Sequence, residues 1–325
     1  MVVGRSAGCS ATPSRMHSGM EEMLTSGALD SLDNDMLMRC ASYLDIDGLV
    51  QLGRTCTRFG FSQPGHQRSL VDEAAHQRFQ QSVTDEERHS LPKYDHESDI
   101  GLCRALESLR KPLSFDELVG HIFGPQEHSA TVTCTDPGIY YTATGRNMMR
   151  GNGWSTAMSG HVMRVGRHFV EFTVTNDDEN FVNLGVIRPV TYGDALKADQ
   201  GRIVSPMSIS SNHAPAVAGR LRSQRTVKWG DSDVHCCTYR CHNGYCHWTD
   251  WSNESGNSDW QGREILRGSG KIGLLLDLGE GTLSVFKDRR RLGGVMKEGL
   301  GGEYCWLAAV HLACTISIAR STAPD

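Results

Sequence analysis

Residues 270–293 decide the fold class of the C-terminal part, and they read GKIGLLLDLGEGTLSVFKDRRRLG. A hydrophobic run leads into Gly279 and Gly281, and glycine adopts turn conformations that other residues reach only with strain. After this turn, Leu283 and Val285 return at alternate positions, as they do in a strand with one buried face. The stretch therefore predicts an antiparallel hairpin that packs one face on a core.

A second turn follows at Asp288 and Arg289. The common two-residue hairpin turn places both central residues at positive φ, where arginine is strained. We therefore expect a wider turn at this point.

The alternating pattern begins at about residue 131 and continues to the C-terminal part. Apolar residues occupy every second position in 170–174 and 182–186, and Gly, Asp and Asn separate such runs. This patterning indicates an antiparallel sandwich with one buried face per sheet. Residues 193–225 form a long polar stretch, so they are predicted to be an inserted loop.

Helical spacing replaces the alternation in the N-terminal part. Apolar residues recur three and four positions apart in 36–44, 49–56 and 69–80, and Asp30 or Asp33 is placed to cap the first helix. Together with the sandwich, these segments predict an α+β chain. A small N-terminal all-α block precedes an antiparallel β-sandwich.

Two shorter helices are predicted between the block and the sandwich. One covers residues 100–110 and ends before Pro112. The other begins at Ser114, whose spacing to Glu117 matches a capping box. The predicted organisation is a disordered N-terminus at 1–27, a helical domain at 28–80, a linker with short helices at 81–128, and the sandwich at 129–321 with its inserted loop at about 193–225.

Composition limits the class of protein. The formal net charge of −5 over 325 residues argues against a nucleic-acid-binding body, which is usually basic. Residues 1–27 contain no continuous apolar stretch, and no window approaches the roughly 18 apolar residues that cross a bilayer. We therefore expect a cytoplasmic or nuclear protein without nucleic-acid or membrane partners. Eleven cysteines, an odd number, favour reduced thiols in such a compartment.

The helical block between Leu32 and Phe59 resembles an F-box. Ser-Tyr-Leu-Asp at 42–45 and Cys-Thr-Arg-Phe at 56–59 match the family's helix end and close, whereas Asp33 stands where the family has proline. The resemblance implies binding to a Skp-type adaptor and, through it, to a cullin. The residues that it implies for this contact are Leu32, Leu37, Tyr43, Leu44, Leu49, Leu52 and Phe59.

The C-terminal part resembles a SPRY domain. This resemblance covers more of the chain than the resemblance to an F-box does. The opening strand GRHFVEF at 166–172, the strand VNLGVI at 182–187 and the hairpin at 270–293 carry this resemblance. In peptide-binding members of the family, loops at one end of the sandwich and a residue on the penultimate strand form the pocket. Carried over by position, the implied target-binding residues are Arg150, Trp154, Tyr192 and His311.

Together, the two resemblances imply the substrate-recognition adaptor of a cullin-type (SCF) ubiquitin ligase. Such an adaptor is non-catalytic and requires no cofactor, because it holds a target protein near a ubiquitin-carrying enzyme. The alternative is a SPRY-based protein–protein interaction scaffold without a ligase role. An exposed apolar surface formed by Leu32, Leu37, Leu44 and Leu49 favours the adaptor, and internal burial of these leucines favours the scaffold.

Residues 235–248 read HCCTYRCHNGYCHW and suggest a zinc site or a thiol active site as competing interpretations. The ligand spacing is irregular, and a strand sends alternate side chains to opposite faces, so we expect a hairpin of reduced thiols without metal. The tryptophan-rich residues 248–260 are open to two interpretations, a partner-binding loop or a packed edge. The acidic run at 177–179 is expected to be a solvated strand connection.

Overall fold

The computed structural model describes residues 32–62, 65, 67–119, 131–136, 140–144, 155–175, 181–191, 207, 209, 211, 214–310 and 314–324. The chain divides into two compact units. The first consists of Met1–Gln81 with Ser98–Ile100, and the second of Ser82–Glu97 with Gly101–Asp325. Each unit is described by itself below.

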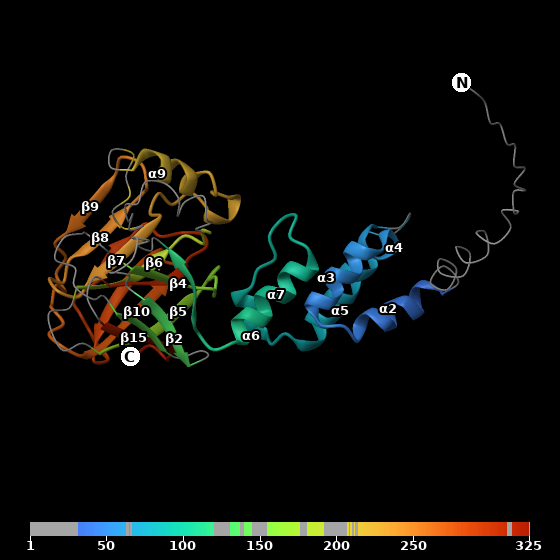
Figure 1. The fold of residues 1–325 in the computed structure, drawn as a ribbon, viewed down its shortest axis with the longest axis horizontal. Helices are drawn as coiled ribbons and strands as arrows, with labels where there is room; N and C mark the ends of the chain where they lie inside the picture. The colour runs from blue at the N-terminus through green and yellow to red at the C-terminus, as the bar shows by residue number, and fades with distance from the viewer. Residues whose placement is uncertain are drawn as a thin grey trace, which may run out of the picture. The chain divides into compact units, whose positions relative to one another are not determined.

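Helices build the first unit (Figure 1), and aspartates cap two of them. The helices are α2 (Asn34–Ser42), α3 (Ile46–Thr55), α4 (Thr57–Gly60) and α5 (Leu70–Ser82). The Asp33 carboxylate accepts the backbone N–H of Met36 at 2.8 Å, and Asp45 accepts that of Gly48 at 2.7 Å. Each cap satisfies a donor that the first helical turn leaves free. None of the described helices is long and apolar enough to cross a membrane.

The predicted apolar face of residues 69–80 is confirmed. Helix α5 buries Leu70, Val71, Ala74, Ala75 and Phe79. These side chains have the spacing of one helical face, as the sequence indicated.

The short helices between block and sandwich follow the prediction only in part. Helix α7 (Asp99–Arg110) forms as expected, and α6 (Asp85–Ser90) adds a helical turn with a capping box at Thr84 and Glu87. The helix predicted from Ser114 is wrong, because residues Phe115–Val119 form strand β1. This strand pairs with β4 (Ser155–Ser159), and Phe115 is buried in the sandwich core, so sheet pairing outweighs the local capping signal.

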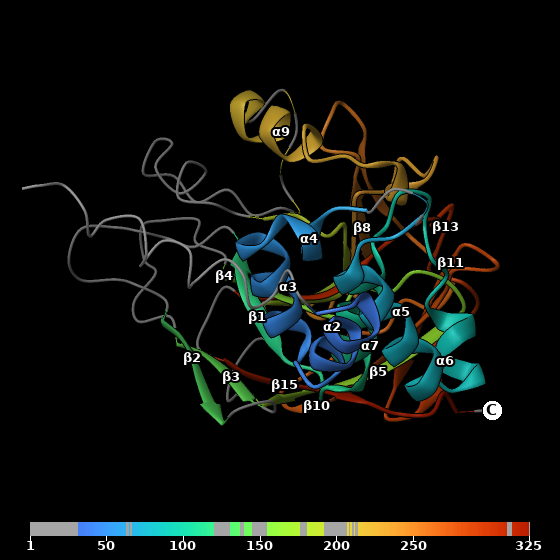
Figure 2. The ribbon, with the colours of Figure 1, turned by 90° about the vertical axis from the view of Figure 1, so that its right-hand side faces the viewer.

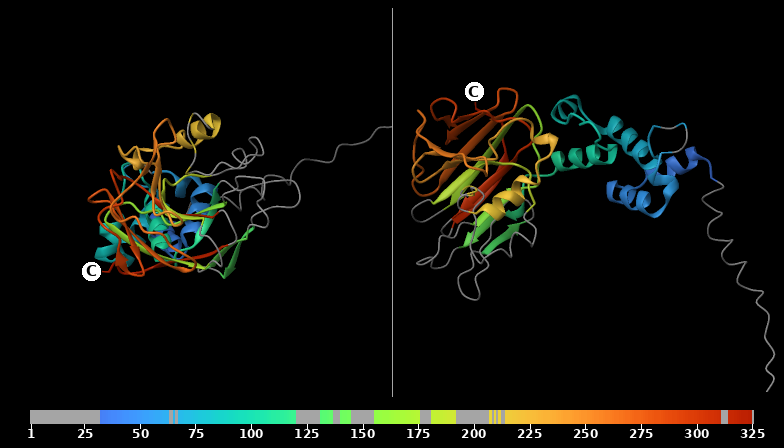
Figure 3. Two further views of the ribbon diagram at one scale, coloured as in Figure 1. Left: turned by 90° about the vertical axis from the view of Figure 1, so that its left-hand side faces the viewer. Right: turned by 90° about the horizontal axis from the view of Figure 1, so that it is seen from above.

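The second unit is an antiparallel sandwich of two sheets (Figures 2 and 3), which confirms the predicted α+β fold class. The first sheet has the order β1-β4-β14-β6-β7-β8-β9, and the second β12-β11-β10-β5-β15-β3-β2, with β13 beside β11. The remaining strands are β2 (Thr131–Asp136), β3 (Tyr140–Thr144), β5 (Arg167–Thr175), β6 (Val182–Ile187), β7 (Cys236–Arg240), β8 (Cys246–Thr249), β9 (Ser255–Ser258), β10 (Gly270–Asp277), β11 (Thr282–Lys287), β12 (Arg290–Arg291), β13 (Lys297–Glu298), β14 (Cys305–Val310) and β15 (Cys314–Arg320).

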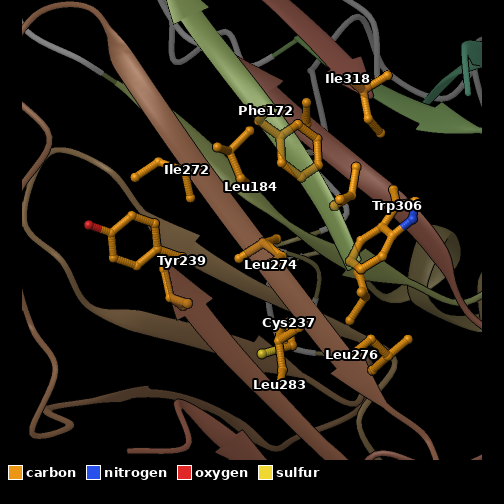
Figure 4. Close-up of a cluster of buried hydrophobic side chains, with 14 of the residues drawn as sticks. Phe172, Leu184, Cys237, Tyr239, Ile272, Leu274, Leu276, Leu283, Trp306 and Ile318 are labelled. Atoms are coloured by element: carbon orange, nitrogen blue, oxygen red, sulfur yellow. The ribbon is translucent and has the colours of Figure 1, made fainter. Parts of the chain in front are cut away.

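The main core lies between the two sheets (Figure 4). Alternate residues of β5, Val170 and Phe172 among them, are fully buried and meet Leu184 and Trp306 from the first sheet. The rings of Phe172 and Trp306 lie 6.4 Å apart in an edge-on arrangement. The period-two pattern therefore places its apolar residues as predicted.

A second apolar layer covers the outer face of the first sheet. Helix α9 (Pro215–Arg222) and the 3₁₀ helix η1 (Val227–Trp229) bury Val217, Leu221 and Trp229 in a cluster with residues of β6, β7 and β14. Every residue of β6 is buried, because both faces of this strand are covered. The predicted inserted loop at 193–225 therefore contains a packed helix in its described C-terminal part.

The hairpin turn at Asp288 and Arg289 is tight, so the predicted wider turn is wrong. Lys287 pairs directly with Arg290, which leaves two turn residues, with φ of 49° at Asp288 and 67° at Arg289. Asp288 donates its backbone N–H to the Lys271 carbonyl at 3.0 Å. Arg289 donates to the Ser321 hydroxyl at 3.3 Å. These contacts offset part of the strain of two non-glycine residues at positive φ.

Candidate functional site

The predicted target-binding residues Arg150, Trp154, Tyr192 and His311 lie outside the described residues. The acidic run at 177–179 lies outside them as well. The target-binding assignment therefore stays a prediction, and the helical block provides the candidate site that the structure describes.

The predicted adaptor-binding residues divide into an internal and an exposed group. Leu37 and Leu49 are each 1% exposed and Phe59 is 2% exposed, so these three form the interior of the block. Tyr43 is 79% exposed at the C-terminal end of α2. The other members are partly exposed, namely Leu32, Leu44 and Leu52.

Helix α2 carries an exposed apolar stripe, which consists of Met36, Cys40 and Tyr43. Met36 is 52% exposed, and the Cys40 thiol is also exposed. Spacings of four and seven residues place these side chains in one row along the helix. Met36 and Cys40 were missing from the predicted contact residues, because spacing alone does not tell them from the buried Leu37 and Ala41 beside them.

Arg58 fixes the beginning of this helix. It belongs to the Cys-Thr-Arg-Phe motif, and its Nη2 donates to the Leu32 carbonyl at 2.7 Å and to the Asn34 side-chain oxygen at 3.1 Å. A residue after α3 therefore holds the chain that enters α2. This role explains why an arginine at that motif position matters for the stripe.

A second polar anchor lies at the start of α5 in the same unit. The Asp99 carboxylate is 4% exposed and lies 3.1 Å from Arg68 Nε and 3.2 Å from His76 Nδ1. A buried carboxylate is stable only with such partners. The cluster therefore fixes α5 within the unit.

The cysteine–histidine hairpin is packed inside the second unit. Cys237, Cys241 and Cys246 are fully buried, and the Sγ atoms of Cys237 and Cys246 lie 3.7 Å apart. Burial raises the pKa of the Cys237 thiol, and the hydrogen bond from Cys237 lowers the pKa of Cys246. Cys236 belongs to the opposite apolar cluster, as the alternation of a strand requires.

The histidines of this hairpin do not converge with those thiols. His235 lies between Trp229 and Trp251, and burial lowers its pKa to about 4. His247 Nε2 lies 2.6 Å from the Met207 carbonyl. Within the described ranges, no three His, Cys, Asp or Glu side chains are grouped to hold a metal ion.

The tryptophan-rich segment packs against the sandwich. Trp251 is fully buried and Trp260 is 8% exposed, with its Nε1 donating to the Gly244 carbonyl at 2.8 Å. Trp248 is partly buried, with the Lys297 ammonium 4.5 Å from its ring centre. Of the two interpretations, the packed edge fits these indoles.

A buried ionic cluster attaches residues 92–97 to the sandwich within the second unit. Arg164 donates to both Glu97 carboxylate oxygens at 2.7 and 2.8 Å and to the Pro92 carbonyl at 3.2 Å. Lys228 lies 3.6 Å from Glu97. Sequence reasoning missed this attachment, because residues 82–99 have the polar composition of a linker.

The pKa values of the two carboxylates in this cluster, Glu97 and Glu303, shift in opposite directions. Burial acts to raise the pKa of Glu97, but the hydrogen bonds and charge of Arg164 outweigh it, so the pKa is lowered. Burial raises the pKa of Glu303, whose carboxylate lies 3.4 Å from Arg164 Nε. Glu97 is therefore the carboxylate whose ionised form the cluster stabilises.

Comparison with known proteins returns structural similarity alone. No protein-family model and no curated protein matches the chain. The SPRY domain of human HERC1 is 11% identical with a TM-score of 0.39, over 65% of this chain and 98% of that chain. The PSpry domain of TRIM65 is 14% identical with a TM-score of 0.34, over 62% of this chain and 93% of that chain.

Proposed function

We propose that this chain is the non-catalytic substrate-recognition adaptor of a cullin-type (SCF) ubiquitin ligase. Its helical block binds a Skp-type adaptor, and its sandwich binds a target protein. The resemblance of residues 32–59 to an F-box suggests the partner. The exposed stripe of Met36, Cys40 and Tyr43 is the observation that carries the proposal.

The stripe has the properties of a helix that docks into an apolar groove. Among the described residues, the large apolar side chains that are exposed are Met36, Tyr43, Phe61 and Val227. Met36 and Tyr43 lie seven residues apart along α2 and its C-terminal end. Different side chains, among them Leu37 and Leu49, form the interior of the block. Burying a methionine or a comparable side chain contributes about 1.5–3 kcal/mol, so the stripe can stabilise a complex without unfolding the block.

The proposed mechanism is proximity. Holding a target lysine near a ubiquitin-carrying enzyme raises its effective concentration, so the chain needs no catalytic group of its own. The antiparallel sandwich supplies a rigid scaffold on which loops vary without loss of the core. Arg150, Trp154, Tyr192 and His311 remain the proposed target-binding residues on those loops.

A capture assay tests the adaptor arm. The full chain is immobilised and incubated with a purified Skp-type adaptor. The double variant Met36→Glu/Tyr43→Ser should lose capture, because it places a charge in the groove and removes the aromatic ring. Phe61→Ser is the matched control, since Phe61 is 68% exposed outside the stripe.

Two outcomes would overturn the adaptor arm. One is absence of capture by the unsubstituted chain, and the other is an equal loss in the Phe61→Ser control. If the sandwich still retains a target protein in that case, the interaction scaffold without a ligase role takes its place.

A further inference from the structure

The outer face of the second sheet carries a continuous group of apolar and basic side chains. In the strand register, Phe169 of β5 lies opposite Leu275 of β10, and Phe286 of β11 lies opposite Arg291 of β12. Their sequence neighbours Val170, Leu274 and Val285 belong to the core between the sheets. Because side chains alternate along a strand, the first group faces away from that core.

An aromatic pair forms the floor of this face. The rings of Phe169 and Phe286 lie 5.3 Å apart at 87°, and they meet over Gly273. A Cβ at Gly273 would lie 2.6 Å from the Phe169 ring, so only glycine leaves room for the pair. Leu275 is 8% exposed and Phe286 is 3% exposed, so Phe169 is the partly exposed ring of this floor.

The group borders a cavity of about 600 Å³, which we call the arginine cleft. Arg167 and Arg291 contribute to its lining, and residues 321–324 contribute from the C-terminal end of β15. Arg289 holds these residues through the Ser321 hydroxyl and the Thr322 carbonyl. The remaining lining residues are Phe169, Leu275 and Phe286.

Positive charge in the cleft is not fully compensated. Arg291 is exposed and donates to the Ser284 hydroxyl at 3.0 Å, and no carboxylate of the described residues lies within 4.0 Å of its guanidinium. Its neighbour Arg290 differs, since it pairs with Glu264 at 2.6 Å. Arg167 lies 3.5 Å from Asp277 and is 66% exposed, so solvent weakens that pair.

We propose that the arginine cleft binds an acidic segment of a partner protein. An apolar side chain of the segment packs on the partly exposed Phe169 ring, which Leu275 and Phe286 support from beneath, and a neighbouring carboxylate accepts from Arg291. The positive charge of the cleft favours a partner segment with negative charge, and the apolar floor favours a peptide over a nucleic-acid backbone. The site goes beyond the proposed function, because it lies outside the predicted loops and needs no Skp-type adaptor.

Fluorescence anisotropy tests the cleft with a labelled peptide of sequence Glu-Glu-Leu-Glu-Glu and the full chain. Arg291→Glu should weaken binding at least about tenfold, which corresponds to the loss of one charge-assisted hydrogen bond. Arg54→Glu makes the same charge change at an exposed position of α3 and should leave binding unchanged. A peptide with Gly in place of Leu should bind more weakly, and a Lys-Lys-Leu-Lys-Lys peptide should not bind.

Equal binding by Arg291→Glu and the unsubstituted chain would overturn the proposal. Equal weakening by Arg54→Glu would also overturn it, because binding would then follow net charge alone. A labelled single-stranded DNA that binds more tightly than the peptide and displaces it would assign the cleft to nucleic acid instead. Arg291→Gln, compared by melting temperature, separates loss of binding from loss of folding. The assay contains no Skp-type adaptor, so its failure leaves the proposed ligase arm untouched.

Discussion

The Arg58 guanidinium donates a hydrogen bond to the Leu32 carbonyl oxygen at 2.7 Å, across 26 residues of the helical block. The contact joins the end of the segment 32–59 to its beginning. Because Leu32 directly precedes the cap of α2, Arg58 controls how the helix with the exposed stripe enters the block.

Arg58→Ala should therefore weaken binding to a Skp-type adaptor while the block stays helical. The lost hydrogen bonds involve a charged donor, and each such bond contributes about 1.5–3 kcal/mol. Titration calorimetry measures the affinity, and circular dichroism measures helix content. Arg54→Ala is the control, since Arg54 is an exposed arginine in the last turn of α3. Unchanged affinity for Arg58→Ala would show that the Arg58 contact has no influence on adaptor binding.

The ionic cluster predicts a pH dependence of stability that Glu97 causes. The pKa of Glu97 is lowered below its ordinary value of 4.5 in the folded protein. The contribution of ionised Glu97 to the free energy of unfolding is therefore complete above that ordinary value. It is lost as the pH falls through the pKa of the folded protein. Glu97→Gln should lower the free energy of unfolding by about 2 kcal/mol at pH 7, and the difference should shrink toward pH 3.

Urea unfolding followed by tryptophan fluorescence measures this difference. The signal reports on the second unit, because all six tryptophans lie within it. Glu298→Gln, at an exposed position, is the control and should change little at any pH. Burial raises the pKa of Glu303 in both proteins, and the charge of Glu97 adds to this shift, so Glu97→Gln removes that smaller part. A difference that stays constant from pH 7 to pH 3 would contradict the assigned role of Glu97.

The tight turn predicts a stabilising substitution. Asp288→Asn/Arg289→Gly places the preferred residues at two positions of positive φ, with φ of 49° and 67°. Relief of strain should exceed the loss of the exposed contact to Ser321 and raise the free energy of unfolding by about 0.5–1 kcal/mol. Thermal unfolding measures the change. Gly281→Ala is the converse test, since φ is 65° there and a Cβ would lie 2.8 Å from the Leu300 carbonyl. A lower melting temperature for the double variant would refute the strain argument.

The sequence predicts elements well where one local signal agrees with the tertiary structure. The period-two runs of β5, β6 and β11 form strands, and Asp33, one of the two predicted caps, caps the helix that it precedes. The prediction fails at Ser114, where a capping box stands before a segment that the sheet recruits as β1. Local propensity cannot anticipate a partner strand about 40 residues later.

The functional residues were only partly predictable for a related reason. Motif positions include both Leu37, which is buried, and Tyr43, which is exposed, and the sequence marks them alike. Exposure depends on which neighbouring elements of the folded block cover each face of the helix. The arginine cleft depends on strand register, because Phe169 lies far in sequence from Phe286 and Arg291, and the sheet brings all three to one face.

Protection of Cys40 from alkylation by a Skp-type adaptor tests the central claim most directly. Cys40 lies between Met36 and Tyr43, and its free thiol is exposed, whereas Cys237 and Cys246 are buried. Iodoacetamide labelling of the full chain is followed by peptide mass spectrometry, with and without the purified adaptor. The account predicts rapid labelling of Cys40 and strong slowing with the adaptor, while labelling of the partly exposed Cys56 serves as the internal reference. Cys40 labelling that is unchanged at saturating adaptor would contradict the assignment of the stripe as the binding surface.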